Sequence, residues 1–403
     1  IYKPFKIQQY SFHHMSIILH KNQIVKISLR IFIFSLCSCG SNQNELIKIN
    51  PKDFHEKEIS LSQIAEEIRY IPLDNSIRLG YIYSIKISNE HFFISAKDIG
   101  ILVFDLNGKF ITKIGDIGRG PKEYVRYQSF AVSDNENIYI MDVDNIIKVF
   151  SINNFIIRTI SLYIYDGDFE KIECFNSKLF ISASSFGNAK YDWIILDTLG
   201  YELMKKPNYI PKFTSNLGGW VGCYKYDNKI NYWNSYNDTV FCINPDLSYN
   251  IALLFSPGNH RLPQAPIIDL SKLSSYMQPH SLFETNQFCI FKYFFDDREI
   301  VAFINKSNKE TSVVPLLIKI NNGYGNYSGG INNDFDNGPD FQPLCYFEMS
   351  KKEYLLGLVN ASDFILQKSG RSGNNISRPH MIEEIAGKIN ETDNPILMIV
   401  KLK

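Results

Sequence analysis

The densest group of potential metal ligands is an acidic segment in the last quarter of the chain. Residues 332–340 are Asn-Asn-Asp-Phe-Asp-Asn-Gly-Pro-Asp and include Asp334, Asp336 and Asp340. Oxygen ligands that alternate ahead of a glycine are typical of a calcium loop, but the twelfth position, normally a bidentate glutamate, is Pro343. Calcium binding is therefore one hypothesis for this segment, and an Asx-rich turn without a metal is the alternative.

A second candidate is the glycine-rich segment of residues 115–121, which carries Arg119. Its glycines are similar to those of a phosphate-binding loop, but no Lys-Ser/Thr pair follows and Pro121 lacks a backbone donor. We therefore interpret the segment as a connection between two strands. The guanidinium of Arg119 remains available in such a connection to contact a ligand.

The histidines and cysteines form no familiar catalytic or zinc motif. His260, His280 and His380 are far apart and lack the HExxH spacing. The five cysteines after residue 39 include no CxxC pair and lie in or beside apolar runs, which is typical of buried thiols. A GxSxG motif is also absent. The sequence therefore assigns no catalytic residue.

The elements that must hold these residues repeat along the chain. Apolar strands end at Phe104, Phe150, Leu196 and Ile243, at intervals of 46, 46 and 47 residues. Each is preceded by one strand and followed by another, and β-branched and aromatic residues fill the runs. A period in the forties with four strands per unit is typical of a β-propeller. Two weaker units follow residue 283, so the sequence predicts an all-β, six-bladed β-propeller of four-stranded blades.

The two ends of the predicted propeller are expected to meet. A short C-terminal helix, with Met381, Ile382, Ile385 and Ile389 on one face, is inserted before the closing strand Ile396–Leu402. Residues 68–73 form a strand ahead of the first blade. We predict that both strands belong to the sixth blade, which would bury their edges and close the ring.

The N-terminal residues are typical of a bacterial lipoprotein leader. Basic residues precede the apolar residues 31–36, and Leu36-Cys37-Ser38-Cys39 resembles a lipobox, whose cysteine carries the lipid. The apolar run is too short to span a bilayer. We predict a leader over residues 1–39 with lipid attachment at Cys39, a tether over residues 40–59, and the propeller over residues 60–403. A cleaved secretory peptide with a chance cysteine is the alternative.

The charge balance limits the partners. The chain has 42 basic and 42 acidic residues and therefore no formal net charge. Nucleic-acid-binding domains normally carry a basic surplus, so no nucleic-acid partner is expected. The lipid anchor, rather than charge, would hold the protein at the membrane.

Several segments resemble known propeller sequences. Residues 103–108 and Ile138–Asp142 are similar to the NHL-type repeat, although the second unit has Ser151 and Asn154 where aspartate and glycine are expected. Residues 118–124 resemble the GRGPgEY stretch of six-bladed propeller lipoproteins common in Bacteroidetes-type bacteria. The resemblance covers about residues 46–403 and implies a lipid-anchored protein of the cell envelope, facing the periplasm or the outer membrane.

Two functional hypotheses follow. The first is a ligand-binding or scaffolding module for a small molecule, a glycan, a peptide or a protein, without a cofactor other than calcium. Its predicted ligand-binding rim consists of Arg119, Asp334, Asp336 and Asp340, because both segments join consecutive blades and should emerge on one face. The alternative is a lyase or hydrolase acting on a glycan or peptide at the channel mouth. Some NHL-type propellers are lyases with a metal held by channel histidines, so the resemblance implies that His260, His280 and His380 could converge.

Overall fold

The structure is a computed structural model that describes residues 46–403, except 55–56, 184–188, 217–218, 268, 321–322, 325–328 and 371–379. These residues belong to one folded unit. The predicted leader, its Cys39 and residues 40–45 lie outside the described residues. No helix of the described part is long and apolar enough to cross a membrane.

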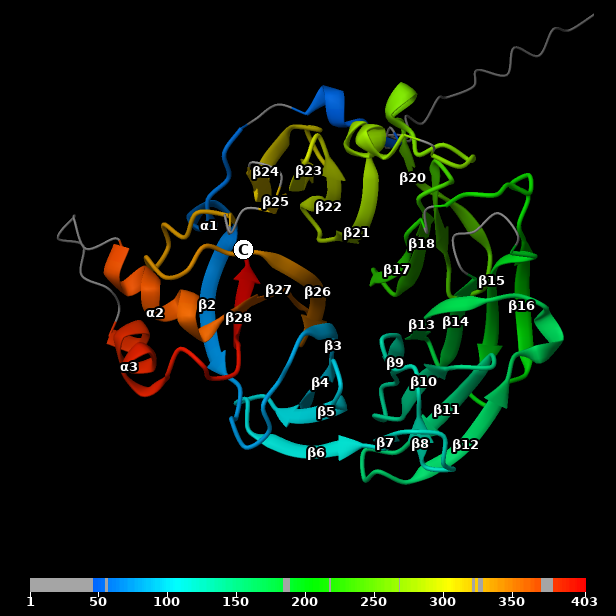
Figure 1. Ribbon diagram of the computed structural model, residues 1–403, viewed down its shortest axis with the longest axis horizontal. Coiled ribbons are helices and arrows are strands. Elements are labelled where there is room, and N and C mark those ends of the chain that lie inside the picture. Colours follow the sequence, from blue (N-terminus) through cyan, green and yellow to red (C-terminus); the bar gives the residue numbers. More distant parts are fainter. Residues whose placement is uncertain are drawn as a thin grey trace, which may run out of the picture. The chain divides into compact units, whose positions relative to one another are not determined.

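Six antiparallel sheets, the blades, surround a common axis (Figure 1). Blade 1 contains β3 (Ile82–Ile87), β4 (His91–Ala96), β5 (Gly100–Asp105) and β6 (Phe110–Ile114), and blade 2 contains β9 (Phe130–Val132), β10 (Ile138–Asp142), β11 (Ile146–Phe150) and β12 (Ile156–Ser161). Blade 3 contains β13 (Phe169–Phe175), β14 (Lys178–Ala183), β15 (Tyr191–Asp197) and β16 (Glu202–Pro207), and blade 4 contains β17 (Val221–Tyr226), β18 (Lys229–Asn234), β19 (Thr239–Ile243) and β20 (Tyr249–Phe255). Blade 5 contains β21 (Gln278–Glu284), β22 (Phe288–Phe295), β23 (Arg298–Asn305) and β24 (Thr311–Ile320), and blade 6 contains β26 (Pro343–Met349), β27 (Lys352–Val359), β28 (Ile396–Leu402) and β2 (Ala65–Pro72). The predicted all-β, six-bladed fold is confirmed.

The predicted repeat corresponds to the third strand of each of the first four blades. In the first five blades, the pairing of the third strand with the fourth shifts register at an equivalent place, next to Phe104 in blade 1 and Phe150 in blade 2. Such a β-bulge increases the local right-handed twist. The interval of about 46 residues therefore reflects one twisted blade.

Blade 2 forms its last turn without the expected aspartate and glycine. Asn154 has φ of 63°, close to the left-handed conformation of Gly108 in blade 1, at 84°. The Ser151 hydroxyl accepts a hydrogen bond from the Phe155 N–H at 3.2 Å, a role that the Asp105 carboxylate has in blade 1. Asparagine tolerates this backbone conformation better than other non-glycine residues, so the substitution preserves the turn.

The ring closes as predicted, through the two ends of the described chain. β28 lies between β27 and β2, and its register pairs Ile396 with Pro72 and Leu402 with Ala65. Figure 1 shows the red β28 beside the blue β2. The short helix α1 (Leu61–Ile64) precedes β2, and the Ser60 N–H donates to Gln63 Oε1 at 3.2 Å across its first turn.

Two details of the predicted organisation differ from the structure. Residues 47–49 of the expected tether form β1 (Ile47–Ile49), which pairs in parallel with the outer edge of blade 4. Two helices, α2 (Ala361–Gly370) and α3 (His380–Lys388), precede β28 in place of one. In α3 Ile382 is buried, whereas Met381 is exposed and does not share its buried face.

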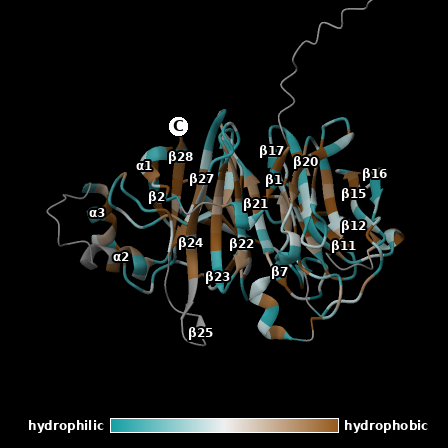
Figure 2. Cartoon of the chain, turned by 90° about the horizontal axis from the view of Figure 1, so that it is seen from above, coloured by the Kyte–Doolittle hydropathy of each residue, from teal (hydrophilic) through white to brown (hydrophobic). Residues whose placement is uncertain are grey.

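Apolar side chains fill the contacts between neighbouring blades. The middle of each strand is hydrophobic and the turns at both ends are hydrophilic (Figure 2). A cluster between blades 1 and 2, for example, contains Phe93, Val103, Tyr124, Ile140 and Phe150, all fully buried. Blades packed in this way hold their innermost strands at fixed distances around the axis.

Candidate functional site

The innermost strands of all six blades enclose a cavity of about 640 Å³ on the axis, here called the axial cavity. Its lining comes from β3, β9, β13, β17, β21 and β26 and the turns that follow them, which surround the centre of the ring in Figure 1. Its volume is within the range of small-molecule sites. A more open depression of about 490 Å³ lies beside α3 and is lined by Pro72, Asn107 and Ile389 among others.

Three charged side chains from different blades meet in the axial cavity. Lys86 of β3 forms an ion pair with Glu173 of β13, across blade 2. The ammonium group of Lys225, on β17, lies 3.7 Å from the other carboxylate oxygen of Glu173. The Glu173 side chain is 5% exposed, whereas that of Lys225 is 51% exposed. The group has two ammonium charges and one carboxylate, so Lys225 retains capacity for a ligand anion.

The protonation states of this group are well defined. Burial opposes the charge on Glu173, but Lys86, Lys225 and the Cys174 N–H outweigh it, so its pKa lies below its usual value. Burial also opposes the charge on Lys86, yet Glu173 raises the pKa of Lys86 above its usual value. Both groups are therefore ionised at neutral pH, and neither is suited to donate or accept a proton there.

Two of the cysteines lie in the axial cavity beside these charges. Burial raises the pKa of Cys223 and of Cys345 to about 12, and it raises the pKa of Cys174 further. A thiol with such a pKa stays protonated and is a poor nucleophile. The five cysteines among the described residues, Cys174, Cys223, Cys242, Cys289 and Cys345, are all free. The prediction of unpaired structural thiols agrees with this arrangement.

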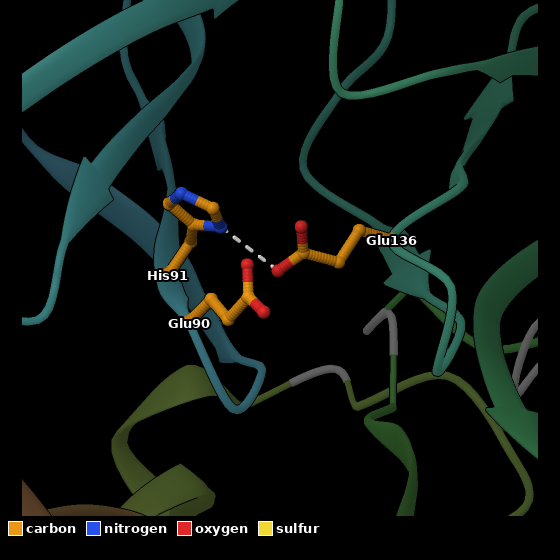
Figure 3. Close-up of side chains that lie close together, drawn as sticks. All are labelled: Glu90, His91 and Glu136. Carbon is orange, nitrogen blue, oxygen red and sulfur yellow. Dashed lines mark hydrogen bonds and ion pairs between the residues drawn. The ribbon is translucent and has the colours of Figure 1, made fainter.

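A second polar cluster lies where blades 1 and 2 adjoin, at the turns between their first two strands. Glu90 and His91 come from blade 1 and Glu136 from blade 2 (Figure 3). The His91 Nδ1 is 2.9 Å from Oε1 of Glu136. One potential ligand atom from each residue lies within 4.8 Å of the others, and this is the one such group of histidine, cysteine and acidic residues in the described part of the chain.

The acidic segment that sequence analysis singled out lies between blades 5 and 6. Its carboxylates contact other parts of the same chain. Asp334 accepts hydrogen bonds from Ser60 Oγ at 2.8 Å and from the Ser62 N–H at 2.8 Å. Asp336 is buried and accepts from the Tyr70 hydroxyl at 3.0 Å, and Asp340 accepts from the Asn333 N–H at 3.2 Å.

These contacts join the acidic segment to α1 and β2, the elements that complete blade 6. The carboxylate oxygens of Asp334 and Asp336 are thus already used by the fold. Calcium binding stays a prediction that no contact in this segment favours.

The glycine-rich segment joins β6 to β9, as expected, and is held by its own residues. Its two short strands, β7 (Asp116–Ile117) and β8 (Glu123–Tyr124), pair in parallel. The Glu123 carboxylate accepts from the Gly120 N–H at 2.6 Å. The buried Tyr124 hydroxyl accepts from the Ile101 N–H at 2.9 Å and donates to the Ile114 carbonyl at 2.6 Å. The motif thus explains the junction of two blades.

Arg119 is exposed within this segment, and it has no hydrogen bond or ion pair to any described residue. It belongs to the junction of blades 1 and 2, whereas the three aspartates belong to that of blades 5 and 6. The structure therefore brings Asp334, Asp336 and Asp340 together but adds no contact between them and Arg119.

The three histidines considered for a channel site do not converge. His260 Nδ1 lies 2.8 Å from the Ser275 carbonyl, in the connection between blades 4 and 5. His280 Nε2 lies 3.2 Å from Glu299 Oε1 within blade 5. His380 is 94% exposed on α3. His91 instead joins the cluster of possible ligands.

Sequence reasoning missed Lys86, Glu173, Lys225 and the cluster around His91. These residues lie on first strands or their turns in different blades, and their spacing has no local periodicity. A search restricted to the first strand of each predicted blade would have found Lys86, Glu173 and Lys225, because those strands face the axis.

Comparison with solved structures supports the fold. A protein of Bacteroides fragilis NCTC 9343 that is thought to be exported superposes with a TM-score of 0.62 at 17% identity, over 89% of this chain and 99% of the other. A member of the DUF4221 family from Bacteroides vulgatus ATCC 8482 has a TM-score of 0.49 at 12% identity, over 84% and 97%. Virginiamycin B lyase from Staphylococcus aureus has a TM-score of 0.41 at 12% identity, over 72% and 81%.

At these identities the similarity shows the fold alone. No curated protein matches the chain. The match to a sequence family is more extensive, because it includes every blade and both strands that close the ring. It spans residues 46–401, and the chain therefore belongs to the family described as a domain of unknown function, DUF4934.

Proposed function

We propose that the protein is a propeller of the bacterial cell envelope that binds a glycan or peptide with a carboxylate group in its axial cavity. The observation that carries this proposal is the half-exposed ammonium of Lys225, which shares the single carboxylate of Glu173 with Lys86. The net positive charge of these three groups favours an anion in a site partly shielded from water.

The rest of the cavity suits a polar ligand. Tyr83, Tyr226 and Phe347 contribute aromatic surface to its lining, and Asp134 and Glu348 contribute carboxylates. Aromatic surface with a few convergent polar groups is typical of ligand sites. We favour this cavity over the rim of Arg119, Asp334, Asp336 and Asp340, because the fold already uses the carboxylates of Asp334 and Asp336.

The same charges favour binding over catalysis. A lyase or hydrolase needs a group that exchanges a proton near neutral pH. The pKa of Glu173 is lowered and that of Lys86 is raised, which moves both away from neutrality. The thiols of Cys223 and Cys345, with pKa values of about 12, are also unsuited to nucleophilic attack.

Calorimetric titration with trigalacturonate, a triglutamate peptide and neutral maltotriose tests this proposal. We expect binding of at least one anionic probe and none of maltotriose. Lys225→Ala should weaken that binding about tenfold or more, because it removes one charge-assisted contact. Lys225→Arg, the matched control, should retain most of the affinity, since it keeps the charge.

Two results would overturn the proposal. One is the absence of heat with both anionic probes, and the other is equal affinity in the wild type and Lys225→Ala. Because Lys225 is half exposed, its replacement should not unfold the protein. Thermal unfolding of each variant verifies this point.

We further propose that a lipid on Cys39 holds the propeller at the membrane. The lipobox-like residues 36–39 support this, as does the name of the Bacteroides fragilis relative, thought to be exported. Cys39→Ser should move the protein from the membrane fraction to the soluble fraction of cells, since the acyl chains provide most of the affinity. Cys37→Ser is the matched control, and membrane retention of Cys39→Ser would refute the anchor.

A further inference from the structure

We propose that Glu90, His91 and Glu136 form a site for a divalent transition-metal ion, in the first place Zn²⁺, at the junction of blades 1 and 2. The proposal is independent of the ligand proposed for the axial cavity. It rests on three side chains from two blades whose potential ligand atoms lie within 4.8 Å of one another. In Figure 3 the side chains of His91 and Glu136 point toward each other, with Glu90 beside them.

The spacing of the two inner ligands fits a coordination sphere. His91 Nδ1 and Glu136 Oε1 are 2.9 Å apart. Two ligand atoms at about 2.1 Å from one zinc ion are separated by about 2.9 to 3.4 Å when the angle between them is octahedral or tetrahedral. These atoms therefore need little movement to share a metal. The exposed Glu90 can supply the third ligand by rotation of its side chain.

The two turns hold the inner ligands in place. In blade 1 the Ser88 hydroxyl accepts from the His91 N–H at 2.9 Å, and the His91 ring contacts that of Phe93 with centroids 6.2 Å apart. In blade 2 the Glu136 N–H donates to the Ser133 carbonyl at 2.8 Å. The Ser88 hydroxyl also donates to Glu136 Oε1. Hydrogen bonds of this kind orient metal ligands and strengthen binding.

The ligand types indicate which metal is preferred. Imidazole suits zinc and other transition metals, whereas calcium and magnesium prefer sites built from oxygen alone. One histidine and two glutamates leave at least one coordination position for water or another ligand. The cluster is next in sequence to Ile87 and Asp134, which line the axial cavity. A bound ion would thus lie near the edge of the axial cavity.

Calorimetric titration of ZnCl₂ into the full chain, after treatment with a chelator, tests the site. MnCl₂, CaCl₂ and MgCl₂ serve as comparison ions. We expect one zinc ion per chain and weaker or no binding of calcium and magnesium. His91→Ala and Glu136→Gln should each lower zinc affinity about tenfold or more. His380→Ala, which removes an exposed histidine near Glu384 on α3, is the matched control and should bind zinc unchanged.

Glu90→Gln keeps the proposal testable if the other two variants unfold, because the exposed Glu90 side chain is not part of the His91–Glu136 contact. It should lower zinc affinity while the melting temperature without metal stays unchanged. Cobalt substitution gives a further measurement, since N/O ligands produce only weak visible bands. The proposal is wrong if the wild type binds no stoichiometric zinc, if Glu90→Gln binds as tightly as the wild type, or if cobalt shows an intense thiolate charge-transfer band.

Discussion

A chain that lacks residues 395–403 is expected to be unfolded or to lose several kcal/mol of its unfolding free energy. The deletion removes β28, which is the strand that joins β27 to β2 and so closes the ring. Leu397, Met398 and Val400 on this strand are fully buried. Loss of one large buried aliphatic side chain typically costs about 2 to 5 kcal/mol, and total stabilities are about 5 to 15 kcal/mol.

The effect should extend beyond blade 6, because β2 would lose its hydrogen-bonded neighbour and the contact between blades 6 and 1 would open. Deletion of residues up to 50, which removes the edge strand β1, is the comparison and should cost less, since β1 forms only three residue pairs with β20. Urea unfolding followed by circular dichroism measures both variants. An unchanged midpoint for the chain without residues 395–403 would contradict this account of closure.

Asp142→Ala should destabilise the protein by about 3 to 5 kcal/mol, because it leaves a buried charge and several backbone donors without their acceptor. The Asp142 carboxylate accepts from the N–H groups of Val125 and Arg126 at 2.8 and 2.9 Å. It also forms an ion pair with Lys148 at 3.1 Å. Asp142 is thus the point where β10 holds the segment that enters blade 2.

Asp142→Asn is the matched control, since an amide oxygen can still accept from the two N–H groups while the ion pair is lost. We expect a smaller loss of stability for this variant than for Asp142→Ala. Equal stability of Asp142→Ala and the wild type in urea unfolding would show that these contacts do not hold blade 2.

The stability contribution of Asp142 should depend on pH. Burial opposes its charge, but the N–H groups of Arg126, Val143 and Val125 and then Lys148 outweigh it, so its pKa is lowered in the folded protein. A lowered pKa stabilises the fold above the unfolded value of about 3.9, and this contribution is lost as the pH falls through the folded pKa. The stability difference between the wild type and Asp142→Ala should therefore shrink in acid.

The function of the glycine-rich motif also differs from what its residue types first indicate. Glycines and an arginine are common in anion-binding loops, but here Gly118 and Gly120 make room for the Glu123 side chain: a Cβ on Gly118 would lie 2.1 Å from Oε2. The Glu123 carboxylate and the Tyr124 hydroxyl then satisfy backbone groups. The motif thus belongs to the architecture of the blade junction, and Arg119 is its exposed part.

The amino-acid sequence by itself determined the fold of this protein. The strands, their turns and the repeat of about 46 residues are local properties, because they arise from side-chain alternation and from residues such as Gly108 and Asn154 that permit a left-handed turn. Ring closure followed as well, since strands Ile396–Leu402 and 68–73 each lacked a local partner.

Only the tertiary structure decided which polar residues meet. Lys86, Glu173 and Lys225 are separated by many residues, and so are His91 and Glu136 in adjacent blades. Their contacts depend on the rotation from one blade to the next, which the packing of buried side chains between blades sets and no sequence interval encodes. The acidic segment shows the converse: Asp334 and Asp336 had suitable ligand chemistry, but Ser60, Ser62 and Tyr70, over 260 residues earlier, donate to their oxygens in the folded chain.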